Sequence, residues 1–556
     1  MIYPRVRKHI FGLLALTVSH VYAAPITPAD REQTQQNQQM LLQQNQQQRD
    51  ELTRSISTDR PAIAAPQAED ERCFVVNDIQ LENASLLSAT TRQRLTKDYL
   101  HQCLGISKIN QLVAEISDWY ISRGYVTSRA FLVEQDLNSG VLRIPVLEGK
   151  LQKIVMDNAP SRQLYMAFPG LEGKVLNLRD IEQGMEQINR VRSTPAQIEI
   201  LPGDNPGYSI VNLTANPEFP LSVSLGFDNS GQKSTGVGQL NGSLVANNPL
   251  GLADKWFISG GRSSAFSHSR DSRSLQAGVS IPWGYGLLDY SYSRSDYRSS
   301  FDNQGFLWLS RGDSTNHRLT GNWVVFRNGD IKTGLMAGLS HYNSHNYLND
   351  ALLQSSTRKL SSLQFGVTHT QKVAGGVATF NPTFSRGMDW FDAESDDGKN
   401  GELPKAQFRK WSLSASFQRP LRDDLWWLSS LYGQWSPDRL YGSERLTLGG
   451  DSSVRGFKEQ YLSGDIGGYL RNELNYTLFT LPVIGQVNAV LALDGGWLQQ
   501  DQYDEFASGT LWGGALGLTT SNRYVATQLT LGTPLQYPDW LGPDHLTAYY
   551  RISLVF

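Results

Sequence analysis

The sequence LTAYYRISLVF, residues 546–556, places an apolar residue at every second position. A period of two predicts a β-strand whose successive side chains point to opposite faces. A charged residue among apolar neighbours suits a strand with lipid on one side and water on the other. One face would carry Leu546, Ala548, Tyr550, Ile552, Leu554 and Phe556, and the other Thr547, Tyr549, Arg551 and Ser553.

The same pattern extends back to Phe219, in segments of about ten residues separated by Gly, Asn, Asp and Ser clusters. Short connections alternate with long ones, as they do between the two rims of an outer-membrane barrel. Residues 219–556 therefore predict a membrane β-barrel of about 16 antiparallel strands. A soluble sandwich or propeller is the alternative, but so many apolar strand faces could not all pack against one another in one soluble layer. In a bilayer, a closed barrel pairs the backbone hydrogen-bonding groups of every strand.

The first residues have the pattern of a secretory signal peptide. Arg5, Arg7 and Lys8 precede an apolar run, Ile10 to Val18, and small residues follow at Ala23 and Ala24. A membrane anchor or a buried helix is the alternative interpretation, but the apolar run is too short to span a bilayer. We therefore expect residues 1–24 to be removed and the mature chain to be exported.

A Gln-rich segment follows, and residues 25–58 are expected to contain one helix, with Asp30 as its N-cap. The segment has no apolar face, so composition alone equally permits a disordered tail. A polar helix could instead lie in a water-filled cavity. Residues 59–72, with Pro61 and Pro66, are expected to be a linker.

Residues 73–150 and 151–218 predict two small α+β domains with the same order of elements, strand, helix, helix, strand, strand. Cys73 and Cys103 are the chain's two cysteines, and both lie in the first domain. An exported chain favours a disulfide between them, and two buried thiols are the alternative.

The long connection 436–466 precedes a strand, GYLRNELNY, in which Tyr469, Arg471, Glu473 and Asn475 share the face predicted to line the lumen. The next strand contains LALDGG, which turns Asp494 inward. A buried carboxylate needs a partner or water. Arg455 could supply it if the Gly-flanked loop folds into the barrel, although a solvated loop charge is the simpler interpretation of a lone arginine.

The sequence Val454-Arg455-Gly456-Phe457, its flanking LGGDSS, the downstream GGYLRNEL and LDGG together resemble the Omp85 superfamily, and within it the outer-membrane transporters of two-partner secretion. The resemblance covers the mature chain. It implies an N-terminal plug helix, a linker, two POTRA domains and a 16-stranded barrel. It also implies that the Val454–Phe457 motif is a gating loop that contacts the wall at Asp494, with Glu473 and Arg471 as further partners. The family often has Phe or Gly where Ala492 stands.

The resemblance further implies a protein-conducting channel that exports one large partner, recognised by its N-terminal secretion domain. The cargo would be a haemolysin, an adhesin or a contact-dependent growth-inhibition toxin. The barrel would lie in outer-membrane lipid of a Gram-negative bacterium, with the POTRA domains in the periplasm. Barrel-assembly machinery would read a C-terminal signal formed by Tyr550, Ile552, Leu554 and Phe556, and the protein would be a monomer.

Two other functions remain open, a barrel-assembly insertase of the same superfamily and a barrel enzyme. The count of two POTRA domains favours transport over insertion. No GxSxG, HExxH or phosphate-loop motif is present in the sequence, so we expect neither an enzyme nor a cofactor. The net charge of −3 gives no support to a nucleic-acid partner.

Overall fold

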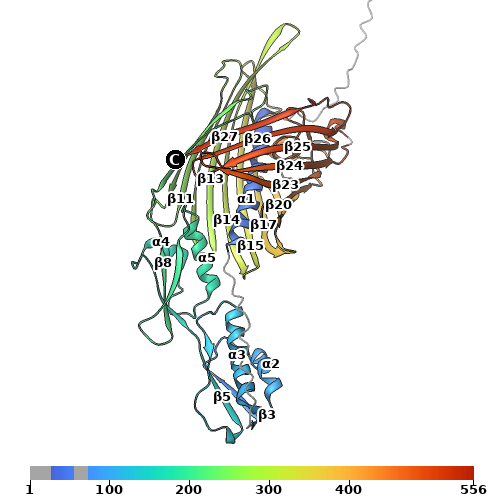
Figure 1. The fold of residues 1–556 in the computed structure, drawn as a ribbon. Helices are drawn as coiled ribbons and strands as arrows, with labels where there is room; N and C mark the ends of the chain where they lie inside the picture. The colour runs from blue at the N-terminus through green and yellow to red at the C-terminus, as the bar shows by residue number, and fades with distance from the viewer. Residues whose placement is uncertain (1–26, 55–72, 502) are drawn as a thin grey trace, which may run out of the picture.

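The computed structural model describes residues 27–54, 73–501 and 503–556, and it contains a helix, two α+β domains and a closed β-barrel (Figure 1). The predicted signal peptide and the predicted linker 59–72 lie outside the described residues. No helix in these described ranges has the length and apolar character needed to cross a membrane.

Sixteen long antiparallel strands close the barrel within the described part of residues 221–555, as the sequence predicts. The two-residue strand β16, Ala351–Leu352, is an additional short pairing on β15. The long strands are β9 Leu221–Asp228, β10 Gln239–Asn247, β11 Lys255–Ser263, β12 Asp271–Trp283, β13 Gly286–Asn303, β14 Phe306–Arg327, β15 Ile331–Leu348, β17 Arg358–Val373, β18 Gly376–Met388, β19 Arg409–Arg422, β20 Leu425–Trp435, β23 Gly467–Leu481, β24 Gly485–Leu498, β25 Gly509–Ser521, β26 Val525–Gln536 and β27 Thr547–Val555.

The last strand closes the ring by pairing with the first. β27 pairs with β9, from Arg551 opposite Asp228 to Val555 opposite Ser224. Phe556 extends this pairing, because its backbone N–H donates to the Val223 carbonyl and its carbonyl accepts from the Val223 N–H. Closure leaves no free edge among the described strands of the barrel, which a bilayer requires.

The period-two pattern divides the wall into two faces. On β23 and β24 the side chains of Leu470, Leu474, Leu491 and Leu493 are exposed on the outside, whereas Tyr469, Arg471 and Asp494 are buried inside. On β27 the side chains of Tyr550, Ile552 and Leu554 are exposed, as is Phe556 beyond its end, and Tyr549 is buried. Apolar groups thus face lipid and polar groups face the lumen.

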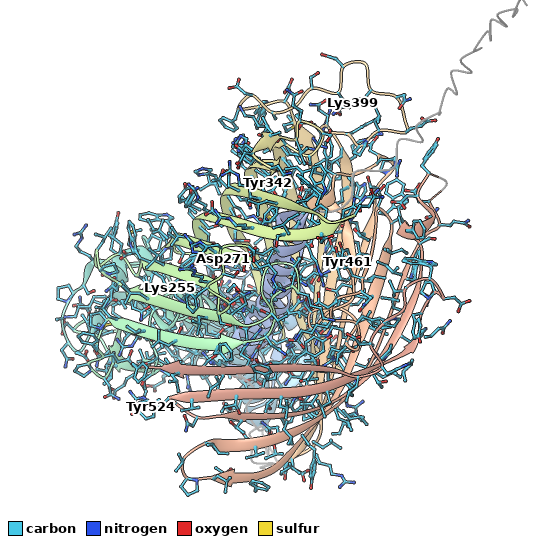
Figure 2. All side chains as sticks on the ribbon, turned by 90° about the horizontal axis from the view of Figure 1, so that it is seen from above. Lys255, Asp271, Tyr342, Lys399, Tyr461 and Tyr524 are labelled. Carbon is cyan, nitrogen blue, oxygen red and sulfur yellow. A yellow bond between two sulfur atoms is a disulfide. The ribbon has the colours of Figure 1, made fainter. Side chains whose placement is uncertain are left out.

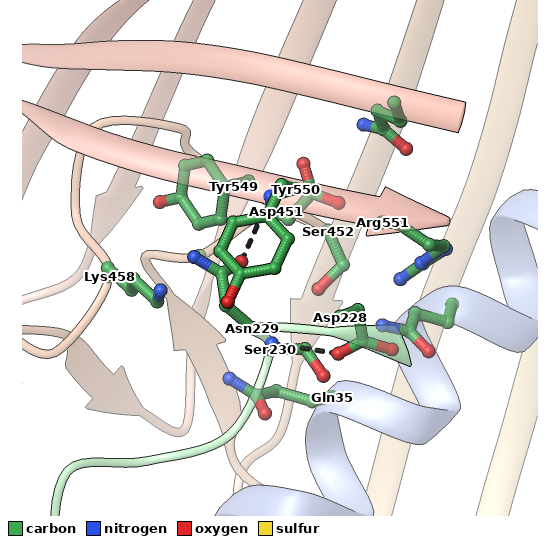
Figure 3. Close-up of a pocket in the computed structure, with 13 residues that line it drawn as sticks. Gln35, Asp228, Asn229, Ser230, Asp451, Ser452, Lys458, Tyr549, Tyr550 and Arg551 are labelled. Carbon is green, nitrogen blue, oxygen red and sulfur yellow. Dashed lines mark hydrogen bonds between the residues drawn. The ribbon is translucent and has the colours of Figure 1, made fainter. Parts of the chain in front are cut away.

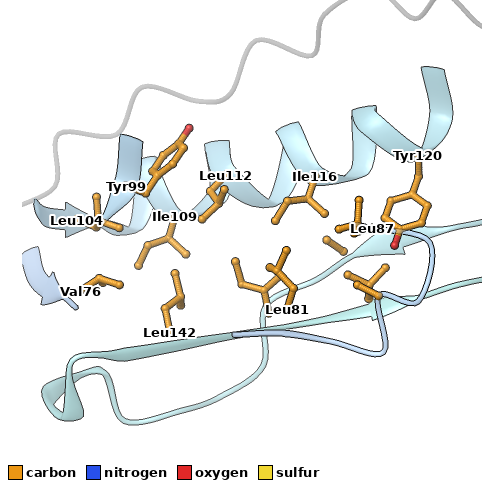
Figure 4. Packing of buried hydrophobic residues seen from close by; sticks show 14 residues of the cluster. Val76, Leu81, Leu87, Tyr99, Leu104, Ile109, Leu112, Ile116, Tyr120 and Leu142 are labelled. Atoms are coloured by element: carbon orange, nitrogen blue, oxygen red, sulfur yellow. The ribbon is translucent and has the colours of Figure 1, made fainter. Parts of the chain in front are cut away.

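The first α+β domain contains β1 Cys73–Val76, β2 Asp78–Glu82, α2 Ala89–Thr96, β3 Gln102–Gly105, α3 Ile106–Ser122, β4 Arg129–Ala130 and β5 Val141–Leu147. Helix α3 buries Ile109, Leu112, Ile116 and Tyr120 against the sheet β2-β5-β4 (Figure 4). The Tyr120 hydroxyl donates to Glu148 over 2.8 Å. Burial, and then this hydrogen bond, raises the pKa of Tyr120.

Three details of this domain differ from the sequence prediction. The first strand is split into β1 and β2, and β3 was not predicted because its four residues show no alternation. The first of the two strands predicted after the helices is reduced to the two residues of β4. Beyond them the side chain of Gln135 bonds to the backbone of Arg143, which replaces strand pairing.

The predicted disulfide between Cys73 and Cys103 is confirmed, and the free-thiol alternative is wrong. The bond joins β1 to β3, whose Cα atoms at the two cysteines are 5.2 Å apart. It closes a loop with a sequence separation of 30 residues. On the chain-entropy model such a loop stabilises the domain by about 3 to 4 kcal/mol.

The second α+β domain repeats the order with β6 Lys150–Met156, α4 Arg162–Ala167, α5 Leu178–Asn189, β7 Gln197–Pro202 and β8 Tyr208–Thr214. In both domains the first long strand pairs in parallel with the last, β2 with β5 and β6 with β8. The predicted internal repeat is therefore present in three dimensions.

Helix α1, Pro28–Thr53, passes through the barrel, where it contacts β13, β14, β17, β18 and β19. Figure 2 shows it inside the ring of strands. The predicted N-cap at Asp30 is wrong. Thr27 is the N-cap, and Asp30 occupies the third helical position, from which its carboxylate accepts a hydrogen bond from the Thr27 backbone. Thr27 and Asp30 form a capping box, in which each side chain bonds to the other residue's backbone N–H.

Candidate functional site

The connection between β20 and β23 folds back into the barrel. Two short strands, β21 Leu446–Leu448 and β22 Leu462–Gly464, pair to form its stem. Its tip is held by the Gly450 N–H, which donates to the Val454 carbonyl over 3.1 Å, and by the Gly449 N–H, which donates to Ser453 over 2.9 Å. We call residues 449–461 the inward loop.

Arg455, at the tip of the inward loop, is bound to Asp494 on the barrel wall. The Arg455 Nε and Nη2 donate to Asp494 Oδ2 and Oδ1, each over 2.7 Å, and the backbone N–H of Arg455 donates to Oδ2 over 3.1 Å. The Asp494 side chain is 0% exposed. This bidentate, charge-assisted contact is the strongest type of hydrogen-bonded pair that two side chains make.

Glu473 and Arg471 of β23 extend this contact into a group of four charges. Glu473 Oε1 lies 2.9 Å from Arg455 Nη1 and 2.9 Å from Arg471 Nη2. Arg471 is the register partner of Asp494 across the strand pair. Two cations and two carboxylates balance, so each buried charge has a partner of opposite sign.

Gly456 lets the tip approach the wall more closely than any side chain would allow. Its φ is +99°, in the region that favours glycine. A Cβ atom added at Gly456 would lie 2.6 Å from the Thr533 carbonyl oxygen on β26. A Cβ at Gly513 of β25 would in turn lie 1.8 Å from the Arg455 carbonyl oxygen. The loop tip and the wall are therefore fitted backbone to backbone.

Apolar side chains on either side of Arg455 fix the tip. Val454 and Phe457 are fully buried in a cluster with residues of the stem and of strands β23–β25. The Phe457 ring also meets Tyr537 edge to face, with 6.2 Å between centroids. The four residues singled out in the sequence thus lie together against one side of the lumen.

Helix α1 is bound to this loop and its stem. Gln38 donates to the Thr447 carbonyl over 2.7 Å and accepts from Ser452 over 3.0 Å. Arg31 donates to the Lys458 carbonyl over 2.6 Å and its guanidinium lies 4.4 Å from the centre of the Tyr461 ring. The helix and the inward loop therefore occlude the lumen as one connected unit.

The other half of α1 is bound to the wall. Asn45 donates to Ser414 over 2.8 Å and accepts from Asn381 over 2.8 Å. Arg49 donates to Gln418 over 3.1 Å and also bonds to Ser416. These contacts are polar and partly exchangeable for water, so they hold the helix without an apolar seam.

Sequence reasoning missed the residues by which α1 binds. Apart from Ala29 and Leu52, the buried positions of α1 are polar, and they recur at spacings of three, four and seven: Arg31, Thr34, Gln38, Asn45 and Arg49. This spacing places them on one helix face. A search for polar residues at helical spacing, instead of apolar ones, would have found them.

A small cavity of about 40 Å³ lies where α1, the inward loop and the strands β9 and β27 meet (Figure 3). Asp228 accepts from the Ser230 N–H over 2.8 Å, and Asn229 accepts from the Tyr550 N–H over 3.0 Å. Gln35 of α1 and Lys458 of the loop line the same cavity. The closing pair of strands is thus adjacent to both occluding elements.

A second cavity, of about 1020 Å³, lies between α1, α5 of the second domain and the barrel wall. It is lined by the Gln-rich face of α1 and by polar wall residues of β13–β15. Among the described residues, no group of three or more His, Cys, Asp or Glu side chains is arranged to hold a metal ion. The lumen is therefore occluded by two elements, α1 and the inward loop.

Comparisons with known proteins agree with this geometry. Residues 207–520 match the family model of the haemolysin secretion/activation proteins ShlB/FhaC/HecB, and residues 74–149 and 150–202 match two POTRA domain models, the first of ShlB type. The chain is 58% identical to the outer membrane transporter CdiB of Escherichia coli, over 96% of this chain and 91% of that protein. It is 50% identical to CdiB of Dickeya dadantii, over 98% of both.

A solved structure of CdiB from Escherichia coli matches with a TM-score of 0.93 over 96% of this chain and 100% of that one. The resemblance drawn from the Val454–Phe457 motif and its surroundings is confirmed. The chain belongs to the ShlB/FhaC/HecB family of haemolysin secretion/activation proteins, in the branch that contains the CdiB outer membrane transporters.

Proposed function

We propose that this chain exports one large partner protein across the outer membrane by two-partner secretion, and that the partner is a contact-dependent growth-inhibition protein. The observation that carries the proposal is a polar lumen blocked by two elements, α1 and the inward loop, which are bound mainly by hydrogen bonds and ion pairs. Its support for the branch is the 58% and 50% identity to proteins named CdiB.

The proposed path begins at the POTRA domains, which would lie in the periplasm. The second domain's sheet has the order β6-β8-β7, so β7 is an edge strand. An extended segment of the partner's N-terminal secretion domain can add to such an edge through backbone hydrogen bonds. Specific recognition would then precede opening.

Opening requires both occluding elements to move. Helix α1 leaves the lumen and the inward loop shifts away from Asp494, which removes the contacts that join them at Gln38 and Arg31. Stepwise folding of the partner outside would drive transport, since a repeat-rich chain that stacks coil on coil biases diffusion outward. The chain acts as a conduit and not as an enzyme in this mechanism, and a monomer in outer-membrane lipid suffices.

Deleting the gene tests the proposal. We expect a single large protein to disappear from the cell surface and medium, while the abundance of other outer-membrane barrels stays unchanged. Complementation with the full-length gene should restore it. Broad loss of other barrels would overturn the proposal, because it is the effect of losing a barrel-assembly insertase.

A further inference from the structure

Three parts of the protein meet at one lysine at the opposite end of the lumen from the inward loop. Lys332, at the start of β15, places its Nζ 2.7 Å from Glu51 Oε2 and 2.5 Å from Glu186 Oε2. Glu51 is in the last turn of α1, whereas Glu186 belongs to α5 of the second POTRA domain. The plug and the POTRA domain therefore share one barrel cation.

The neighbouring cation, Arg327 at the end of β14, is bound by three side chains of α5. Its Nη2 lies 2.7 Å from Glu186 Oε1 and its Nε 3.4 Å from Glu182 Oε2. Its Nη1 donates to Gln183 over 3.0 Å. Arg179 adds a positive charge on the POTRA side, with its Nη1 2.7 Å from Glu182 Oε1. Two carboxylates of α5 thus face the two barrel cations.

Contacts that do not involve α1 fix α5 on the rim of the barrel. Gln187 donates to the Gly284 carbonyl over 3.2 Å, and the Tyr285 hydroxyl donates to Asp180 over 2.5 Å. Arg190 donates to the Ala253 carbonyl over 2.6 Å. Glu186 is consequently held beside Lys332 by the docking of the POTRA domain itself.

Two carboxylates on one ammonium group compete for it. Glu51 and Glu186 repel each other because both are negatively charged. Each carboxylate therefore weakens the ion pair that Lys332 forms with the other carboxylate. If Glu186 were absent, the departure of α1 would take away the carboxylate of Glu51 from Lys332, whose side chain is only 14% exposed. Leaving a buried charge without a partner is strongly unfavourable.

We infer that Glu186 is a positioning residue for plug release, a resident counter-ion that keeps Lys332 paired after α1 has left. When α5 is docked on the rim, Glu186 weakens the ion pair between Lys332 and Glu51 that holds the C-terminal end of α1. When α5 is drawn away from the rim, that ion pair becomes stronger. This inference rests on the proposed function in that a passenger needs the plug to leave. Glu186 is then the POTRA residue through which the periplasmic domain influences the release of α1 from the lumen.

The test uses the purified full-length protein in planar bilayers without any partner, with time-averaged conductance as the readout of plug departure. The variants are Glu186→Gln, Glu51→Gln, their combination and Lys332→Gln. The matched control is Glu199→Gln, an exposed glutamate on β7 of the same domain. Gln44 lines the lumen cavity while α1 is in the barrel, so labelling of Gln44→Cys by a maleimide too bulky to enter that cavity gives a second readout that does not depend on conductance.

We expect Glu186→Gln to lower conductance and labelling about fivefold, because Lys332 then holds Glu51 alone. Glu51→Gln and Lys332→Gln should raise both readouts, and Glu186→Gln should have no effect in the Glu51→Gln background. An increase or no change with Glu186→Gln, or the same change in both backgrounds, overturns the inference. Since no secretion is measured, failure of the export function would not alter these outcomes.

Discussion

Replacing Arg455 with alanine should release the inward loop from the barrel wall. The substitution removes the two side-chain hydrogen bonds to Asp494 and the ion pair to Glu473, and it leaves the backbone N–H of residue 455 as a donor to Asp494. Removing one partner of a buried ion pair costs about 3 to 5 kcal/mol. Arg471, the register neighbour of Asp494, can take over part of the interaction, so the lower value applies.

A loss of about 3 kcal/mol shifts the equilibrium between bound and released loop by about a hundredfold. Hydrogen exchange of residues 449–461 in the full-length protein measures that shift directly, because local opening governs the exchange of these amides. We expect protection of the Gly450 and Arg455 amides to fall by up to this factor, with little change in β12 to β18.

Arg270→Ala is the matched control, since Arg270 is exposed in the connection between β11 and β12. It should leave the exchange of the inward loop unchanged. Equal protection of residues 449–461 in the wild type and in Arg455→Ala would refute the view that this contact holds the loop in place.

Three further perturbations test other parts of the structure. Gly456→Ala should destabilise the bound loop by about 2 kcal/mol, because a φ of +99° strains any residue other than glycine. The new Cβ would also lie 2.6 Å from the Thr533 carbonyl oxygen. The backbone amides of the inward loop should therefore exchange hydrogen faster in this variant than in the wild type. Gln38→Ala should raise single-channel conductance by removing one hydrogen bond from α1 to the stem, at Thr447, and one to the inward loop, at Ser452, whereas Gln44→Ala, at an exposed position, should not. Cys73→Ser should make the first POTRA domain less stable by about 3 kcal/mol, seen as faster limited proteolysis of that domain alone; an unchanged rate would contradict a stabilising role for the bond.

The barrel could be predicted from sequence because its signal is local. Each strand carries its own alternation, as in Leu470 and Leu474 against Arg471 and Glu473, so the faces follow without knowledge of the neighbours. The strand number also followed, since lipid thickness fixes the length of each crossing. Short strands such as β3 carry too few residues to show a period, and they were missed.

The contacts of the site depend on tertiary structure to different degrees. Arg455, Asp494 and Glu473 were singled out through the motif and its surroundings, and the structure brings these three side chains together. The polar stripe of α1 was present in the sequence at helical spacing and was not sought, because helix faces are usually recognised by apolar residues. The shared cation Lys332 joins residues from three separate parts of the chain, so no sequence pattern marks it.

The most direct test of export through the lumen is a reversible lock on the helix. Asn45 and Ser414 are in hydrogen-bond contact at 2.8 Å, and cysteines at both positions, Asn45→Cys with Ser414→Cys, should form a disulfide in the oxidising periplasm. Wild type treated with the same reductant controls for reduction of Cys73–Cys103. We expect secretion of the partner to stop in the doubly substituted strain and to resume when reductant opens the cross-link. Undiminished secretion with the helix covalently held in the barrel would contradict the account.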